Sequence, residues 1–283
     1  MRFAILLFAV IGLYAQSETR GIVPEEVLKA RPQPKAAAAG PVPKPVYQPA
    51  TPDMGRPAAA RQVGVTIWRL RPANGREGGA RILVQQESAT EELIPERINS
   101  TSSLKAGDRV RLTIESPETG YLYVIDREGY AGGERGEPYL IFPTSRTRGG
   151  DNHVSAGKLI DIPGQDDRPN FFTLQQSRPN QVEEELTVLL TRESLPDLGI
   201  GRKALKLTEE QVGEWEKKWG AAKVQRFELS GGAGKPWTQA EQLAAAGGTR
   251  VLTQEDPPPQ TVYRVAVKPG EPVMVKVRLR YMR

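Results

Sequence analysis

The sequence predicts a mostly β protein, an antiparallel β-sandwich of the Ig-like or jelly-roll-like kind with a small helical insertion. Two observations carry this prediction. Short segments with alternating apolar and polar residues recur along the chain, as in strands of a sheet. Glycine, proline and aspartate turns separate these segments at intervals of about ten to fifteen residues, with no helical pattern between most of them.

The chain begins MRFAILLFAVIGLYAQS, which has the order of charged, apolar and small residues that is typical of a secretory signal peptide. We expect a signal peptide over residues 1–15, cleavage near Ala15, and a periplasmic or secreted protein. The chain contains no cysteine, which excludes a lipid anchor attached to cysteine. It also excludes disulfide bonds as a source of stability in the mature protein. Its stability must therefore come from a hydrophobic core. An exported protein without disulfides is more typical of a bacterial cell envelope or secretome than of a eukaryotic extracellular space.

A proline- and alanine-rich stretch follows, densest over residues 30–61. Proline fixes φ and removes amide donors, so we expect residues 16–61 to form an extended, largely disordered spacer outside the core. The spacer is either a stalk that holds the domain away from a surface or a tail without a role. The folded β-sandwich domain is expected at residues 62–283.

The first strands of that domain are expected at residues 63–71 and 81–86, paired as a hairpin across a glycine-rich loop. The segment DRVRLTIES alternates between one apolar and one polar face, which predicts a strand buried on one side only. The apolar face carries Val110, Leu112 and Ile114, and the polar face carries Arg109, Arg111 and Thr113.

Further strands are expected over residues 120–126, 138–142, 158–162, 170–174 and 185–193. The C-terminal segment from 273 to 281 alternates valine and leucine with lysine and arginine. A KPGE turn is expected to pair it with the strand that precedes it.

Residues 196–258 have a different texture and form the predicted helix-containing insertion. A short amphipathic helix is expected to begin near Glu209, because Thr208 and Gln211 have capping-box spacing. Its Trp215 and Trp219 suit packing on the sheet better than a cofactor or carbohydrate site. A strand is expected at 224–229. A second helix follows, opened by Thr238 with a glutamate three positions on.

The sequence lacks the motifs of several common cofactor and metal sites. SGGAGKPWT at 230–238 is no phosphate loop, because Leu229 stands where the first glycine belongs and Pro236 follows Lys235. No dinucleotide fingerprint is present. His153 is the only histidine, which excludes zinc sites built on several histidines. The net charge of +5 is spread along the chain, which does not suggest nucleic-acid binding.

Carboxylates in turns are the remaining candidates for chemistry, as cation ligands or as an acid and base pair. They are Asp126, Glu128, Asp151, Asp166 and Asp167. None has the spacing of a calcium loop, and each occupies a place where acidic residues form turns. We therefore assign no catalytic, cofactor-binding or metal-binding residue and expect no cofactor.

The motifs GDRVRLTIES, GYLYVID, PYLIFPT, RGGDN, AGKLIDIP, FFTL and LTVLLTRE occur in this order over residues 104–195. In this order the segment resembles the bacterial domain-of-unknown-function family numbered 4384. The resemblance implies a β fold in an accessory module of an exported or multidomain bacterial protein, with no established activity and no site residues. The segment REGYAGGERGE departs from the tight turn that is common in that family.

The sequence thus favours a non-enzymatic cell-envelope module that binds or scaffolds a protein, a glycan or an anionic surface. It suggests no nucleic-acid partner and no transmembrane span in the mature chain. One alternative is a polysaccharide or peptidoglycan hydrolase that uses two carboxylates among Asp126, Glu128 and Asp151. The other is an accessory domain stabilised by calcium.

Overall fold

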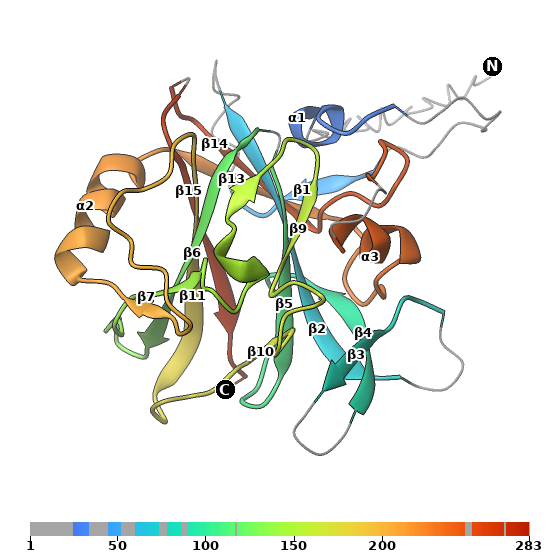
Figure 1. Cartoon of the computed structure of the whole chain (residues 1–283), viewed down its shortest axis with the longest axis horizontal. Helices are drawn as coiled ribbons and strands as arrows, with labels where there is room; N and C mark the ends of the chain where they lie inside the picture. The colour runs from blue at the N-terminus through green and yellow to red at the C-terminus, as the bar shows by residue number, and fades with distance from the viewer. Residues whose placement is uncertain are drawn as a thin grey trace, which may run out of the picture.

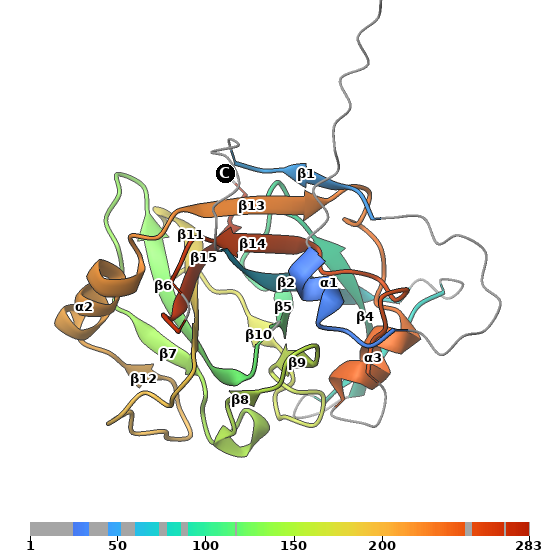
Figure 2. The same cartoon turned by 90° about the horizontal axis from the view of Figure 1, so that it is seen from above.

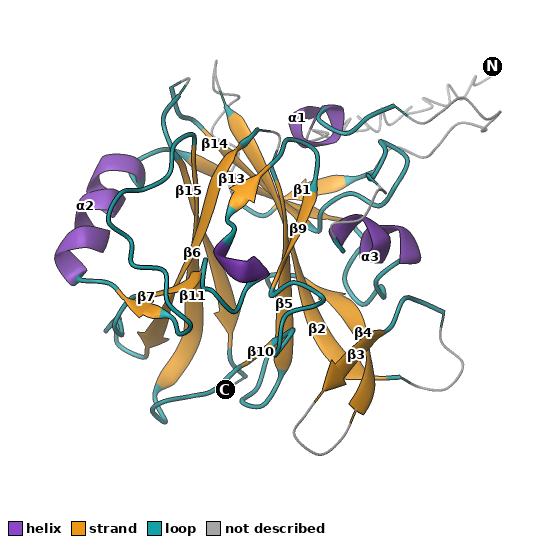
Figure 3. Ribbon diagram, in the orientation of Figure 1, coloured by secondary structure: helices purple, strands orange, loops and turns teal. Residues whose placement is uncertain are grey.

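A computed structural model describes residues 25–33, 45–51, 60–73, 78–85, 90–116, 118–246, 251–268 and 270–282. The predicted signal peptide at 1–15 lies outside these residues. The described chain is mostly β, with two antiparallel sheets that pack face to face (Figures 1 and 3). The predicted fold class is therefore confirmed.

The first sheet is built around a long central strand, β2, which pairs with β14 and then β4 along one edge and with β5 along the other. Strands β9 and β10 extend the sheet beyond β5. Its strands are β1 (Tyr47–Pro49), β2 (Arg61–Pro72), β3 (Ile82–Gln85), β4 (Thr90–Ile98), β5 (Arg109–Glu115), β9 (Leu159–Ile162), β10 (Phe172–Thr173), β13 (Val224–Leu229) and β14 (Thr261–Val265).

The second sheet has the order β12-β7-β6-β11-β15, with β8 paired to β6 as well. The long strands β6 and β11 form its centre. Its strands are β6 (Gly120–Tyr130), β7 (Tyr139–Phe142), β8 (His153–Val154), β11 (Gln181–Thr191), β12 (Leu205–Lys206) and β15 (Val273–Arg280).

The main hydrophobic core lies between the two sheets. Alternate residues of each strand point inward, so Leu112 of β5 and Val65 of β2 share this core with Val124 of β6, Val188 of β11 and Val275 of β15. All five side chains are essentially inaccessible to solvent. This burial of aliphatic side chains is the principal source of stability in a chain without disulfides.

Short helices pack on the outside of the sandwich: α1 (Glu25–Lys29), α2 (Glu209–Trp219) and α3 (Gln239–Ala245). A single 3-10 turn, η1 (Arg148–Gly150), precedes β8. α2 and α3 lie on opposite sides (Figure 2). Both predicted caps are present. The Thr208 side chain accepts a hydrogen bond from the Gln211 amide, and Thr238 and Glu241 form a reciprocal capping box.

Two predicted hairpins are wrong. β2 does not pair with β3, because β4 lies between them and pairs with both. The sequence TEELIPERI of β4 is rich in charge and contains a proline, so its alternation does not stand out. β15 pairs with β11 and not with β14, because the chain crosses from the first sheet to the second after β14.

The prediction that β5 is buried on one side only is also wrong. Arg111 and Thr113, on its polar face, are 1% and 5% exposed. Arg111 forms an ion pair with Asp161 of β9 at 3.1 Å, and Thr113 donates a hydrogen bond to the same carboxylate at 2.6 Å. The polar face is covered because distant segments fold over it, and the buried charges are paired there.

The described parts of the predicted spacer belong to the folded domain. Tyr47 lies in β1, which pairs with β13, and the Tyr47 side chain is 3% exposed. Val27 of α1 packs in the same small cluster. Arg31 is buried in an ion pair with Glu115 of β5. The proline-rich composition predicts that these segments lie outside the core, but residues 25–33 and 45–49 pack against the first sheet. The remainder of the predicted spacer falls largely outside the described residues.

Candidate functional site

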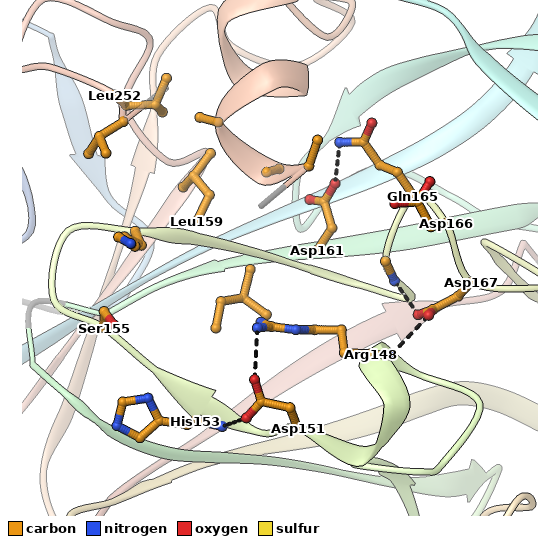
Figure 4. Close-up of a pocket in the computed structure, with 17 residues that line it drawn as sticks. Arg148, Asp151, His153, Ser155, Leu159, Asp161, Gln165, Asp166, Asp167 and Leu252 are labelled. Atoms are coloured by element: carbon orange, nitrogen blue, oxygen red, sulfur yellow. Dashed lines mark hydrogen bonds and ion pairs between the residues drawn. The ribbon is translucent and has the colours of Figure 1, made fainter. Parts of the chain in front are cut away.

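A pocket of about 450 Å³ opens where the C-terminal end of α3 meets the loops on either side of β9 (Figure 4). It collects segments that are far apart in the sequence. Its lining residues are Arg148, Asp151, His153, Ser155, Lys158, Leu159, Ile160, Asp161, Gly164, Gln165, Asp166, Asp167, Ala244, Ala245, Ala246, Val251 and Leu252.

The floor of the pocket is the open edge of β9. Three consecutive residues of this strand, Leu159 to Asp161, line the pocket. Successive side chains of a strand point to opposite faces, so a cavity that touches three in a row touches the edge of the strand. Within the described part of the chain, β9 pairs only with β5. The opposite edge of β9 therefore faces the pocket.

The loop after β9 is held against η1 by one carboxylate. Asp167 accepts a hydrogen bond from the Gly164 amide at 2.6 Å, which closes the turn at 164–167. Its other oxygen accepts a hydrogen bond from the Arg148 amide at 2.9 Å. Asp151 accepts a hydrogen bond from the His153 amide at 2.9 Å and forms a long ion pair with Arg148 at 3.5 Å. These acids shape the walls of the pocket.

Asp161 is the most buried acid of the pocket. Burial raises the pKa of Asp161, while the Arg111 charge and the hydrogen bonds from Thr113 and Gln165 act in the opposite direction. Arg111 is itself fixed by hydrogen bonds to the carbonyl oxygens of Asn170 and Pro163, both at 2.8 Å. With its acceptor oxygens engaged in this way, Asp161 has a structural role on the outer face of the first sheet.

Two charged side chains of the pocket are exposed and unpaired. Neither Lys158 nor Asp166 forms an ion pair with any described residue. Lys158 directly precedes β9, and Asp166 lies in the loop beyond the other end of this strand (Figure 4). A free cation and a free anion therefore stand near opposite ends of the open strand edge.

The sequence candidates separate into two groups. Asp151, Asp166 and Asp167 meet in the pocket together with His153, whose ring packs edge-on against Tyr121 with centroids 5.5 Å apart. Within the described residues, however, no group of three acidic or histidine side chains is placed to hold a metal ion. Arg148 and Lys158 were not predicted from the sequence, because no motif distinguishes them from other surface cations.

Asp126 and Glu128 lie elsewhere, in the second half of β6, and neither lines the pocket. Strand alternation places Asp126 on the inner face of the sandwich, diagonally across from Glu184 of β11. Burial raises the pKa of Asp126 to about 7. Burial and the charge of Asp126 raise the pKa of Glu184 to about 8. Glu184 was missed because VEEEL reads as a solvated run of acids.

The oxygen atoms of this second group explain the raised pKa values. Asp126 Oδ1 and Glu184 Oε2 are buried without a hydrogen-bond partner. Tyr281 and Gln181 donate hydrogen bonds to the other oxygen of Glu184, each at 2.8 Å. Glu128 accepts hydrogen bonds from Tyr130 and Ser177. Protonation of one of the two carboxyl groups would remove a buried negative charge and so reduce the free-energy cost of burying these oxygens without partners.

The tryptophans of α2 pack on the outer face of the second sheet, as expected. Trp215 and Trp219 are partly buried against a cluster that includes Tyr123, Leu189 and Met274. Their rings stack with centroids 6.2 Å apart. Their packing accounts for their position without a ligand.

Comparison with known proteins gives a partial result. Residues 103–194, about a third of the chain, match the family model described as "Domain of unknown function (DUF4384)". This match confirms the resemblance inferred from the sequence over residues 104–195. No curated protein and no solved structure matches the chain. Among the described residues, no helix has the length and apolar character that a membrane span requires.

Proposed function

We propose that this protein is an exported, non-enzymatic β-sandwich module of the bacterial cell envelope that binds a partner through the pocket at β9. One observation carries the proposal. The pocket of about 450 Å³ combines an open strand edge with two unpaired charges, Lys158 and Asp166. Open edges and concave surfaces with a few free polar groups are the usual means by which β domains bind partners.

Within the pocket, the acids other than Asp166 already have partners. Asp151 and Asp167 accept hydrogen bonds from backbone amides, and Asp161 is paired with Arg111. A pair of carboxylates that performs acid and base chemistry needs free oxygens that converge on a substrate. Asp126 and Glu128 lie together on the inner face of β6, away from Asp151 and outside the pocket, and the carboxyl group of Asp126 is largely buried there, so this pair does not converge on the pocket where a substrate could bind. The geometry favours binding over hydrolysis.

The proposal of export rests on the sequence of residues 1–15. If cleavage occurs near Ala15, only a short segment separates the mature N-terminus from α1, which packs on the first sheet.

A pull-down from envelope extract tests the proposal. The tagged mature chain is compared with a variant that exchanges the two free charges, Lys158→Glu with Asp166→Lys. The control exchanges two exposed charges outside the pocket, Lys203→Glu with Glu210→Lys. We expect a partner that the wild type and the control retain and that the pocket variant loses. Equal retention by all three proteins would contradict a role for the pocket.

Export is tested separately by fractionation of cells that express the full chain. We expect the mature form in the periplasm or medium, shortened at its N-terminus when examined by mass spectrometry. An intact N-terminus in the cytoplasm would refute export and leave the binding proposal standing on its own test.

A further inference from the structure

We infer that the ligand of the pocket is an extended peptide that adds to the free edge of β9 as an antiparallel strand, with a basic residue near its N-terminus and an acidic residue near its C-terminus. The inference rests on the proposed binding function and names the class of ligand.

The first step is the state of the strand edge. β5 occupies one edge of β9, and no described strand occupies the other. An edge strand presents a row of backbone N–H and C=O groups, and an extended peptide can pair with them without any change in the fold. Every pairing between the described strands of the two sheets is antiparallel, and antiparallel pairs are slightly more stable per residue.

The second step is the charge at each end of the edge. Lys158 stands at the start of β9, and Asp166 lies beyond its end. Four strand residues span roughly 13 Å at about 3.3 Å each. A peptide antiparallel to β9 brings its N-terminal part toward Asp166 and its C-terminal part toward Lys158. A basic residue and an acidic residue at those places would pair with the two free charges.

The third step is the difference between the two sides of the edge. On the side of α3, the pocket is lined by apolar side chains, including Ala244, Val251 and Leu252. On the other side lie Arg148 and Asp151 (Figure 4). The side chains of an added strand alternate between these two sides, so apolar and polar residues should alternate in the peptide.

These three steps define a probe, the peptide Gly-Ser-Lys-Val-Thr-Val-Glu-Ser-Gly. Its reversed control exchanges the lysine and the glutamate. A second control replaces the central threonine with proline, which has no N–H to donate and fixes φ. Binding of each peptide to the mature chain is followed by amide NMR titration.

We expect the first peptide to shift the amide signals of residues 159–162 and to slow their hydrogen exchange. The reversed peptide should bind roughly 3- to 10-fold more weakly, because it loses two exposed ion pairs and each such pair contributes only a small binding free energy. The variant Lys158→Glu with Asp166→Lys should invert this preference, while the variant Lys203→Glu with Glu210→Lys should keep it. Both pairs of positions are exposed, and circular dichroism verifies that each variant is folded.

Several results would overturn the inference. They are the absence of any binding, equal binding of the two orientations in the wild type, and undiminished binding of the proline peptide. A dimer of the free protein that forms through β9 and dissociates in the pocket variant would assign the edge to a second copy of this chain. If no peptide binds while the pull-down still depends on the pocket, the peptide inference fails and the proposed function remains.

Discussion

Arg31 donates two hydrogen bonds to Glu115, from Nε to Oε1 at 2.6 Å and from the second guanidinium nitrogen to Oε2 at 2.8 Å. The two side chains are 1% and 2% exposed. Arg31 also donates hydrogen bonds to the carbonyl oxygens of Thr253, Asp256 and Pro257. This pair joins the N-terminal segment to a central strand of the first sheet and to the loop before β14.

Replacement of Arg31 by alanine should strongly destabilise the domain. The change leaves the Glu115 carboxylate buried without its partner, and loss of one member of a buried ion pair costs about 3 to 5 kcal/mol. Urea denaturation measures the loss. The matched control is Arg61→Ala, which removes the more exposed pair of Arg61 with Glu118 and should cost at most about 1 kcal/mol. Equal effects of the two substitutions would show that residues 25–33 do not contribute to the fold.

The turn before β9 also contacts the N-terminal segment. Gly157 has φ of +70°, and a Cβ at this position would clash with the carbonyl oxygen of Ala30. We expect Gly157→Ala to displace residues 25–33 and to cost more than about 1 kcal/mol. In the control Gly133→Ala, φ is +90° but no atom lies near the new Cβ, so only backbone strain is added. Limited proteolysis should cut the N-terminal segment faster in the first variant alone.

The facing carboxyl groups of Asp126 and Glu184 predict a loss of stability as the pH rises from the acidic range through neutrality. The folded-state pKa values of about 7 and about 8 lie above the ordinary carboxyl values, so the folded protein holds these protons more tightly than the unfolded chain. Their contribution is complete below the ordinary carboxyl range and is lost as the pH rises through about 7 to 8. The melting temperature should therefore fall as the pH rises from about 5 to about 8.

Asp126→Asn tests this assignment, since an amide cannot ionise. The fall of the melting temperature between about pH 5 and pH 8 should be shallower in this variant than in the wild type. The control Asp151→Asn changes an exposed acid of the pocket and should leave the slope unchanged. The groups that face the pair are Glu128, Tyr281 and Gln181. An unaltered slope in Asp126→Asn would refute the coupling of the two carboxyl groups.

An ion-pair network that joins α2 to the second sheet predicts the opposite pH dependence. Partial burial would raise the pKa of Glu216, but hydrogen bonds from Arg135 and Lys276 lower it to about 2. The contribution of this pairing is present above the ordinary carboxyl pKa and is lost as the pH falls toward 2. Glu216→Gln should lower stability at pH 7 by up to about 1 kcal/mol, because the group is partly exposed.

The difference between Glu216→Gln and the wild type should disappear near pH 2, as measured by thermal unfolding. Glu214→Gln, a change on the same helix at an exposed position outside its first turn, should have little effect at either pH. A difference that persists at low pH would mean that Glu216 acts through packing and not through its charge.

Many of the strands and helices could be predicted because the local sequence pattern determines them. The alternation in β6, β11 and β15 reports their burial, and Thr208 and Thr238 mark where α2 and α3 begin. Strand pairing could not be predicted in the same way. β4 escaped detection because its charged residues and Pro95 break the alternation, although they are accommodated between β2 and β3.

The burial of the polar face of β5 depends on residues far away in the sequence. Arg111 is covered because Asp161 and the segment around Asn170 meet it, and Glu115 is covered because Arg31 reaches it from the N-terminal segment. A local pattern reports only the polarity of a face. It does not report whether a distant segment brings a partner of opposite charge.

The candidate site shows the same limit. Asp151, Asp166 and Asp167 were each identified as turn residues, and Asp151 and Asp167 do form turns. That they face one pocket depends on the positions of β8, β9 and the end of α3 in space. Nor does the sequence of β9 reveal that one of its edges is open, since strand order is a property of the assembled sheet.

The central claim is that the pocket at β9 is the surface through which this protein binds its partner. Photocrosslinking in bacterial cells tests it most directly, with a photoreactive amino acid at Ser155 in the pocket or, as the control, at exposed Lys203. We predict a discrete adduct from position 155 that disappears when Lys158→Glu and Asp166→Lys are added, and none from position 203. No adduct from position 155, or the same adduct from both positions, would contradict the claim.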